Sequence, residues 1–268
     1  MDFLTAIIEK KKARLQISQE GTTTATQRAR AIDARLQRKP HALLEALVNG
    51  PSINIIAELK RASPSRGEIN ADFDLAERAQ AYQRGGAIAI SILTEEDYFQ
   101  GSLDDLRVVR QTVPLPLLRK DFIVDEFQIY ESAAAGADAV LLIVAALSDE
   151  ALRNLRSIAE DELGMDALIE VHTAEELRRA SDCGATLIGV NNRDLHTFEV
   201  SLETSAQLIQ EAPRDVICIS ESGLRTAEDL HRLKESGYKG FLIGEALMRA
   251  EDPAVVLKEL LSGSVRVA

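Results

Sequence analysis

The sequence contains no tryptophan, and phenylalanine and tyrosine together supply only 4% of its 268 residues. It has only two cysteines, Cys183 and Cys218, which form neither a Cys-x-x-Cys pair nor a metal-ligand spacing. Two cysteines so far apart predict reduced, packed side chains and exclude a disulfide-rich fold. Hydrophobic residues still make up 46% of the chain, so aliphatic side chains must build a sizeable core and wholesale disorder is excluded.

The chain also lacks a long hydrophobic run. Its most apolar segment, residues 133–147, is too short to cross a membrane and is interrupted by Gly136 and Asp138. The N-terminus lacks the basic, apolar and small-residue regions that make up a secretory signal peptide. These absences predict a cytoplasmic protein that has no membrane partner.

Positive charge is scarce, since 31 Lys and Arg face 43 Asp and Glu, for a formal net charge of −12. This excess of acid excludes a general nucleic-acid binder, which needs a basic surface to contact phosphates. Residues 1–50 are the exception, with nine Lys or Arg against five Asp or Glu. We predict that Lys10, Lys11 and Lys12 in this segment help to attract an anionic substrate.

A short apolar run, a polar or glycine-rich turn and an amphipathic helical pattern recur eight times from residue 53 onward. The runs are apolar on both faces, as parallel strands covered by helices are. They cover residues 55–60, 87–93, 117–121, 139–144, 167–171, 187–191, 216–221 and 240–244. Eight such units predict an α/β fold, a (β/α)8 TIM barrel. The alternative, an open doubly wound sheet, should carry Gly-x-Gly-x-x-Gly after its first strand, and residues 60–67 lack it.

Helical patterns follow the strands, and Ser148, Thr173, Ser201 and Thr226 stand where helix N-caps are expected. The patterns cover residues 73–84, 103–110, 126–135, 149–162, 174–180, 202–209, 227–235 and 253–261. Three more helical patterns precede the repeat, at about residues 2–16, 27–38 and 41–48. We therefore predict an N-terminal helical extension, residues 1–50, packed on a barrel formed by residues 51–268, together a single domain.

Charged and polar residues end most of the predicted strands, and a TIM barrel has its active site at these C-terminal ends. Alternation along the first strand places Glu58 and Lys60 on the same side. The other strand ends carry Lys120, Glu170, Asn191, Arg193, Glu221 and Ser222. Their convergence favours a catalytic site over the alternative, polar layers that merely fill the barrel. The four histidines show no metal spacing, and we assign them no role.

Glycines follow the seventh and eighth strands, at Gly223 and Gly244. Loops at these two places often bind phosphate in TIM barrels, because exposed N–H groups can approach its oxygens closely at glycine. Ser63 can add a hydroxyl contact, so we predict a small phosphorylated substrate. Phe99 and Phe122 at the same end of the barrel either line a pocket for a ring or pack in the core.

Several of these segments resemble motifs of the indole-3-glycerol phosphate synthase family, in order and over nearly the whole chain. They are AELKRASPS at 57–65, LRKDFIV at 118–124, LIEV at 168–171, IGVNNRDL at 188–195, ISESG at 219–223 and GFLIGEALM at 240–248. The resemblance implies a TIM barrel of tryptophan biosynthesis, a carbon–carbon lyase (carboxy-lyase). Such an enzyme converts 1-(2-carboxyphenylamino)-1-deoxyribulose 5-phosphate to indole-3-glycerol phosphate, releases CO₂ and water, and needs no cofactor or metal.

The resemblance also implies roles for individual residues. Lys120 is the first choice as general acid in ring closure, and Lys60 is a competing or later acid or a ligand of the substrate's anionic groups. Glu170 acts as base in the dehydration. The remaining catalytic residues orient groups, complete the charge network or contact hydroxyls, and they are Glu58, Asn191, Arg193, Glu221 and Ser222.

Two groups of residues bind the substrate by the same resemblance. Phosphate contacts fall to Ser63, Gly223, Gly244 and Glu245. Some family members have serine at position 245, so only the backbone contact of Glu245 carries over. The wall around the anthranilate ring consists of Pro64, Phe99, Phe122 and Leu141.

Two other functions compete with this one. Phosphoribosylanthranilate isomerase is a shorter phosphate-binding barrel with a cysteine near its first strand end, where this chain has Glu-Leu-Lys. A non-catalytic barrel that binds phosphate would not need Lys60, Lys120 and Glu170 together. No exposed apolar helix is expected, which favours a monomer.

Overall fold

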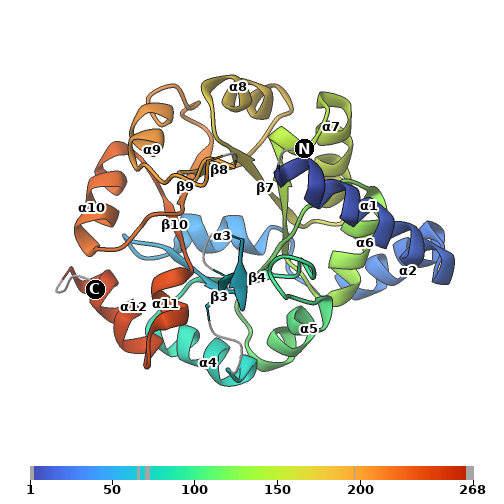
Figure 1. Ribbon diagram of the computed structural model, residues 1–268, viewed down its shortest axis with the longest axis horizontal. Helices are drawn as coiled ribbons and strands as arrows, with labels where there is room; N and C mark the ends of the chain where they lie inside the picture. Colours follow the sequence, from blue (N-terminus) through green and yellow to red (C-terminus); the bar gives the residue numbers. More distant parts are fainter. Residues whose placement is uncertain (1–2, 65–66, 70–72, 196, 264–268) are drawn as a thin grey trace.

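The computed structural model describes residues 3–64, 67–69, 73–195 and 197–263 of the chain. Eight parallel strands in these ranges close into a barrel surrounded by helices, which confirms the predicted TIM barrel (Figure 1). The strands are β1 (Ile55–Leu59), β4 (Ala89–Leu93), β5 (Leu117–Lys120), β6 (Ala139–Ile143), β7 (Asp166–Val171), β8 (Leu187–Asn191), β9 (Ile217–Glu221) and β10 (Gly240–Ile243). The barrel closes where β1 pairs with β10, with Ile55 opposite Phe241.

A helix follows each strand, close to the predicted positions. These helices are α4 (Leu75–Gly85), α5 (Leu103–Thr112), α6 (Glu126–Ala135), α7 (Asp149–Ser157), α8 (Ala174–Asp182), α9 (Glu203–Leu208), α10 (Ala227–Ser236) and α12 (Pro253–Ser262). The structure adds short elements that periodicity did not indicate. They are the hairpin β2 (Ala62–Ser63) and β3 (Gly67–Glu68), the 3-10 turn η1 (Val144–Ala146), the π-helical turn η2 (Ile158–Glu162) and helix α11 (Glu245–Arg249).

Side-chain caps fix the start of several helices. The hydroxyls of Ser148, Thr173 and Thr226 each accept a hydrogen bond from a backbone N–H in the first turn of α7, α8 and α10, as predicted. The prediction for Ser201 is wrong by one residue, because α9 has Leu202 at its N-cap and no side-chain cap. Ser201 Oγ instead accepts from the N–H of Glu203 at 3.3 Å.

The interior is largely aliphatic, and the hydroxyls of the buried tyrosines Tyr82 and Tyr238 both donate hydrogen bonds to backbone carbonyls. Tyr82 is fully buried and its hydroxyl donates to the carbonyl of Glu58 at 3.0 Å, which ties α4 to the end of β1. Cys183 and Cys218 are buried and free, so both are packing residues as predicted. No helix in the described ranges is long and apolar enough to span a membrane.

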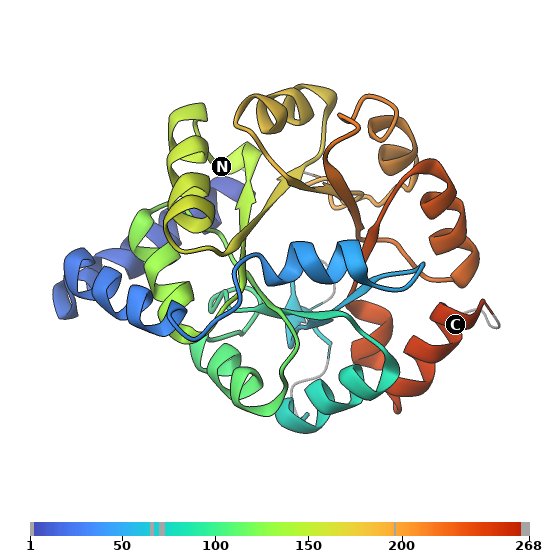
Figure 2. The same ribbon diagram turned by 180° about the vertical axis from the view of Figure 1, so that it is seen from behind.

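The extension contributes α1 (Phe3–Gly21), α2 (Thr24–Arg35) and α3 (Ala42–Asn49), and it reaches both ends of the barrel. α3 crosses the end where the strands begin (Figure 2), and the N–H groups of Leu43 and Leu44 donate there to Asp166 of β7. α2 packs on α6, and α1 continues towards the end where the strands stop. We propose that the helical extension, residues 1–50, and the barrel, residues 51–268, together form one domain.

Lys11 of α1 is not the free cation that electrostatic attraction of a substrate requires. Its side chain is buried, and its Nζ lies 2.8 Å from Asp121 Oδ1 and 2.7 Å from Glu96 Oε2. Asp121 follows β5 directly and also receives a hydrogen bond from Arg119 at 3.0 Å. Two carboxylates therefore neutralise Lys11, and the predicted attraction cannot include it. Instead, Lys11 anchors the extension to the end of β5.

We expect Lys11→Met to lower the free energy of unfolding by about 2 kcal/mol, the order of a hydrogen bond to a charged group. The substitution leaves the buried Asp121 and the partly exposed Glu96 each without this cationic partner. Urea denaturation followed by circular dichroism measures the change. Lys12→Met is the matched control, because Lys12 is exposed on the same helix and should cost less than about 0.5 kcal/mol. Equal effects of the two substitutions would contradict the anchor.

Candidate active site

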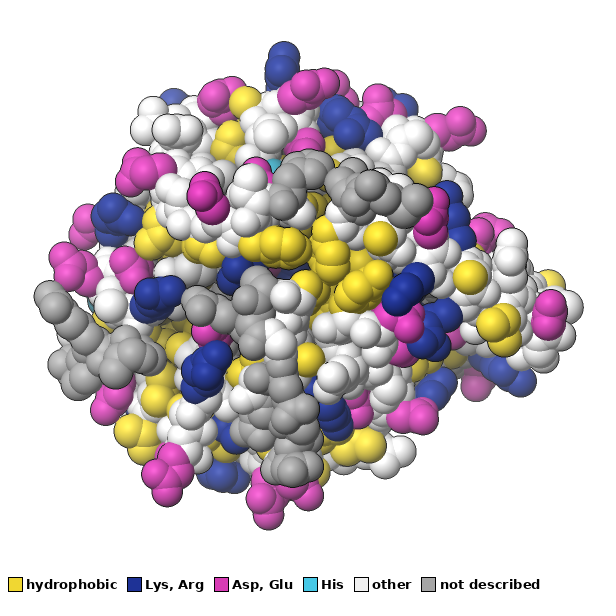
Figure 3. Space-filling model, viewed as in Figure 1, with side chains coloured by type: hydrophobic (Ala, Val, Ile, Leu, Met, Phe, Trp, Pro, Cys, Tyr) yellow, Lys and Arg dark blue, Asp and Glu magenta, His cyan; other side chains and the backbone are white. Residues whose placement is uncertain are grey.

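One pocket, of about 360 Å³, opens at the C-terminal ends of the strands. In the face of the molecule shown in Figure 3, hydrophobic and basic side chains gather around its centre, where the barrel opens. Every site residue predicted from the sequence lines this pocket, and they are Glu58, Lys60, Ser63, Pro64, Phe99, Lys120, Phe122, Leu141, Glu170, Asn191, Arg193, Glu221, Ser222, Gly223, Gly244 and Glu245. Of the other residues considered, Ser65 and His196 lie outside the described ranges.

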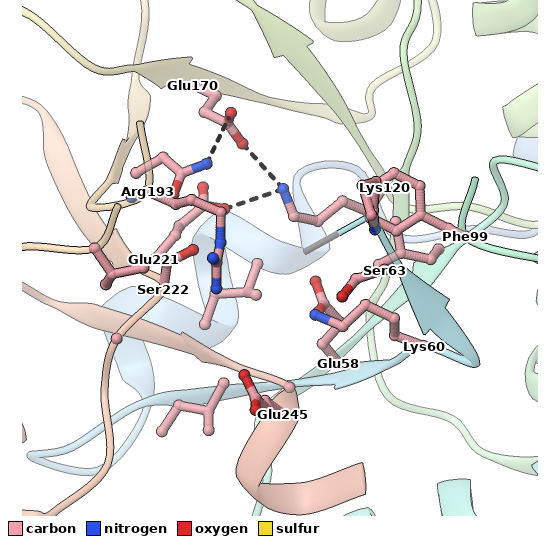
Figure 4. A pocket seen from close by; sticks show the side chains of 18 of the residues that line it. Glu58, Lys60, Ser63, Phe99, Lys120, Glu170, Arg193, Glu221, Ser222 and Glu245 are labelled. Carbon is pink, nitrogen blue, oxygen red and sulfur yellow. Dashed lines mark hydrogen bonds and ion pairs between the residues drawn. The ribbon is translucent and has the colours of Figure 1, made fainter. Parts of the chain in front are cut away.

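Lys120 at the end of β5 lies between two carboxylates (Figure 4). Its Nζ is 3.0 Å from Glu170 Oε2 on β7 and 3.1 Å from Glu221 Oε2 on β9. Burial alone would lower the pKa of Lys120, but the attraction of Glu170, Glu221 and Glu58 outweighs it and raises the pKa above its usual range. The pocket therefore holds a fixed, charged ammonium group at its centre.

The pKa values of the two carboxylates that face Lys120 shift in opposite directions. Burial opposes ionisation of Glu170, but Lys120 and His172 overcome it and hold the pKa of Glu170 below its usual range. Asn191 Nδ2 also donates to Glu170 Oε1 at 3.1 Å. Burial raises the pKa of Glu221 to about 7, and the negative charge of Glu170 adds to this rise. One carboxylate is thus kept ionised while the other can carry a proton near neutral pH.

The predicted pairing of Glu58 with Lys60 is present at the end of β1. Lys60 Nζ lies 2.6 Å from Glu58 Oε1, and both side chains are largely shielded from solvent. Gly244 lies directly against this pair, because a Cβ atom there would come within 2.4 Å of Glu58 Oε1. The absence of a side chain at Gly244 therefore leaves space for the Glu58 carboxylate.

Gly189 on β8 plays the same part for Glu221. A Cβ atom at Gly189 would lie 2.1 Å from Glu221 Oε1 and 3.3 Å from Leu168 Cδ1. Because the clash involves the far end of a side chain, Glu221 can rotate away and the fold survives. We expect Gly189→Ala to lower kcat by about 10²-fold, the order seen for a 1 Å misplacement in an active site. Steady-state kinetics and thermal melting measure the two effects, and an unchanged kcat would contradict the tight fit.

The turn after β9 has an unusual backbone. Ser222 and Gly223 both have positive φ angles, 66° and 79°, and serine rarely adopts this conformation. Asn192 stabilises the turn, since its Nδ2 donates to the carbonyls of Glu221 at 2.9 Å and Ser222 at 3.1 Å. A side-chain amide thus holds the predicted phosphate loop from behind.

Two arginines that the sequence reasoning missed lie near this loop. Arg225 and Arg249 line the pocket, and Arg249 Nε is 3.4 Å from the carboxylate of Glu245. This ion pair offsets the negative charge of the Glu245 side chain. The signal was available, because both arginines follow the two predicted phosphate loops within a few residues.

The extension also contributes to the pocket, through Phe3 of α1. The Phe3 ring lies 5.2 Å from that of Tyr98 and 5.1 Å from that of Phe198, with edge-to-face geometry in both pairs. These partners are far away in the sequence, so no local pattern indicated the contact. Phe99 and Phe122 also line the pocket, with ring centroids 6.3 Å apart.

His172, to which the sequence analysis assigns no role, does not line the pocket but lies next to Glu170. Its Nε2 lies 3.4 Å from Glu170 Oε1. The signal was the two-residue spacing from Glu170, the same alternation that paired Glu58 with Lys60. In the described ranges, no group of three or more His, Cys, Asp or Glu side chains is arranged to hold a metal ion.

Comparisons with known proteins agree on one family. The family model described as indole-3-glycerol phosphate synthase matches residues 4–260. A protein of that name from Chloroherpeton thalassium is 47% identical over 251 residues, 94% of this chain and 96% of its own. Another from Koribacter versatilis is 52% identical over 209 residues, 78% of this chain and 80% of its own.

Solved structures at low sequence identity support the fold alone. A 3-hexulose-6-phosphate synthase superposes with a TM-score of 0.62 at 15% identity, over 80% of this chain and 100% of its own. A thiamine phosphate pyrophosphorylase from Pyrococcus furiosus gives a TM-score of 0.59 at 17% identity, over 80% of this chain and 96% of its own. At such identities the shared architecture says nothing about substrate.

Proposed function

The chain belongs to the indole-3-glycerol phosphate synthase family, and from that premise we propose how its pocket carries out the family's reaction. The substrate is 1-(2-carboxyphenylamino)-1-deoxyribulose 5-phosphate, and the products are indole-3-glycerol phosphate, CO₂ and water. The observation that supports this reaction best is the buried ammonium of Lys120 between Glu170 and Glu221. Proton donors and acceptors stand together there, as ring closure followed by dehydration requires.

Lys120 is the acid of the ring closure in this proposal. The aromatic carbon that bears the carboxylate attacks the C2 carbonyl, and the carbonyl oxygen takes a proton from Lys120 as its negative charge develops. Loss of CO₂ then restores the aromatic ring. Lys120 is preferred over Lys60 because three carboxylates hold it as an ammonium at the centre of the pocket.

Glu170 is the base of the dehydration. It removes a proton from the carbon next to nitrogen, while Lys60 protonates the departing hydroxyl, which leaves as water. Glu170 can then return its proton to Lys120, whose Nζ lies 3.0 Å away. Lys60 recovers its proton from solvent, so each turnover consumes one proton and the carboxylate leaves as neutral CO₂. Asn191 orients Glu170, and Glu58 orients Lys60, through the contacts described above.

The rest of the pocket binds the two ends of the substrate. We place the phosphate against Ser63, the loop at Gly223 and the backbone of Gly244 and Glu245. The anthranilate ring lies against Pro64, Phe99, Phe122 and Leu141 in this proposal. Arg193 and Ser222 face the sugar hydroxyls, which lie between the phosphate and the anthranilate ring. We also propose that the protein acts as a cytoplasmic monomer and uses neither a cofactor nor a metal.

The fluorescence of the indole product tests this function. Purified protein with the carboxyphenylamino substrate should give a steady rise in indole fluorescence and release an equal amount of CO₂. No rise in fluorescence from protein with the circular dichroism of a folded barrel would refute the function. CO₂ release without indole fluorescence would refute the dehydration step alone.

A further inference from the structure

His172 has a setting that the proposed reaction does not use. It follows β7 directly and lies behind Glu170, with its side chain only 12% exposed. Nε2 is 3.4 Å from Glu170 Oε1, and Nδ1 is 3.2 Å from Glu176 Oε2 on α8. The backbone N–H of His172 donates to the same Glu176 oxygen at 2.7 Å. The imidazole is therefore held between two carboxylates.

This geometry favours a doubly protonated ring. A neutral imidazole has one acceptor nitrogen, which would face a carboxylate and be repelled, whereas an imidazolium avoids this repulsion: its Nδ1 lies within hydrogen-bond distance of Glu176, and its Nε2 forms an ion pair with Glu170 at 3.4 Å. Burial would lower the pKa of His172, but Glu170 and Glu176 outweigh it and raise the pKa to about 10. His172 is thus a buried cation at neutral pH.

Glu176 is itself fixed in place. Thr173 caps α8 by accepting the N–H of Glu176 at 3.2 Å, so Glu176 occupies the first turn of the helix. A carboxylate there is favoured by the helix dipole. A chain of contacts therefore runs from the N-terminus of α8 through Glu176 and His172 to Glu170.

The reaction supplies a reason for a second cation beside Glu170. The charged and polar groups of other elements that face Glu170 are Lys120 of β5, Asn191 of β8 and, across Lys120, Glu221 of β9. When Lys120 gives its proton to the substrate, it becomes a neutral amine and no longer stabilises the Glu170 carboxylate. Only His172 among these neighbours keeps a positive charge at that moment.

We infer that His172, held by Glu176, is a positioning residue that keeps Glu170 ionised and aimed into the pocket while Lys120 is deprotonated. This inference rests on the proposed role of Glu170 as base. The imidazolium supports the carboxylate through the step between ring closure and dehydration. It also sets the pH below which Glu170 becomes protonated and turnover stops.

His172→Gln tests the inference, because glutamine keeps an N–H donor but carries no charge. Loss of a cation favours the protonated carboxyl, so the acidic limb of the kcat–pH profile should move to higher pH by about one to three units. At neutral pH we expect kcat to fall about tenfold with little change in KM, the lower end of the loss seen when a partner that orients a metal ligand is removed. A profile that superimposes on that of the wild type would overturn the inference.

Glu176→Gln separates charge from packing. This variant keeps the imidazole of His172 and a side-chain acceptor for the backbone N–H of His172, but it removes the anion that holds the ring protonated. We expect a smaller shift of the acidic limb in the same direction, and almost no added effect in the His172→Gln background. Glu175→Gln is the matched control, because it removes a neighbouring exposed charge from the same helix turn and should leave the profile unchanged. Additive shifts, or an equal shift in the control, would overturn the inference.

A spectroscopic readout covers the case in which His172→Gln fails to fold. Nitrogen-15 NMR of histidine-labelled wild-type protein should show one ring that stays doubly protonated at pH 8 and becomes neutral in Glu176→Gln. A neutral His172 ring at pH 8 in the wild type would overturn the inference. If Glu170→Gln keeps full turnover, the proposed base is wrong. If only His172→Gln keeps the wild-type profile, the inference alone fails.

Discussion

Replacing Lys120 with alanine is expected to lower kcat by about 10²–10⁴-fold while the barrel still folds, the range typical of a lost general acid. The ring closure needs a proton at the carbonyl oxygen, and this substitution removes the ammonium that the pocket holds for that purpose. Glu170 and Glu221 lose their shared cation as well. We expect Glu221 to become protonated in this variant, because its pKa of about 7 makes it easier to neutralise than Glu170.

Indole fluorescence measures kcat for this variant, and circular dichroism with thermal melting verifies the fold. Lys258→Ala is the matched control, because Lys258 is an exposed lysine on α12, away from the pocket, and its loss should leave kcat unchanged. A kcat for Lys120→Ala within a few-fold of the wild type would assign the acid role to Lys60 instead. A collapse of the fold would contradict the expectation that the barrel folds without this ammonium group.

The barrel itself was predictable because its determinants are local. Strands buried on both faces give continuous apolar runs, and helices between them give a 3.6-residue period, so eight units are readable without any long-range information. Short elements were not predicted, because a prediction from local periodicity needs several residues of one pattern. The π-helical turn η2 follows α7 without a break in the apolar pattern, and β2, β3 and α11 are too short to show a period.

The site was predictable where strand alternation and topology act together. Glu58 of β1 and Lys60 just after it lie close enough to pair, and the topology of a TIM barrel brings the ends of β5, β7 and β9 to the same opening. What alternation cannot provide is the partner of each charge. Lys120 faces Glu170 and Glu221 at nearly equal distances, and only the closed barrel determines that arrangement.

Charge counting failed at Lys11 for a related reason. The sequence shows an excess of basic residues in the extension, but burial decides whether such a charge acts on the surroundings or on a partner. Lys11 lies 85 residues away from Glu96 and 110 away from Asp121 in the chain, so no local pattern could indicate these partners. Phe3 reaches the pocket by the same kind of long-range contact.

Glu170→Gln should also lower kcat by about 10²–10⁴-fold, but at a different step from Lys120→Ala. Glutamine matches the shape of glutamate and can still accept from Lys120, yet it cannot take the proton that dehydration releases. Ring closure and decarboxylation should therefore proceed. In a single turnover we expect CO₂ release to precede indole fluorescence, whereas Lys120→Ala should delay both signals equally.

The pH dependence of this variant follows from the same cluster. Burial and the negative charges of Glu170 and Glu58 together raise the pKa of Glu221 to about 7, so removing the charge of Glu170 removes one of these three causes. The pKa of Glu221 should then fall, and any step in the kcat–pH profile near pH 7 should move to lower pH. The direction is opposite to the upward shift expected for His172→Gln. If CO₂ release and fluorescence slow together, Glu170 acts before the dehydration. If the pH profile stays where it is in the wild type, the charge of Glu170 does not affect the pKa of Glu221.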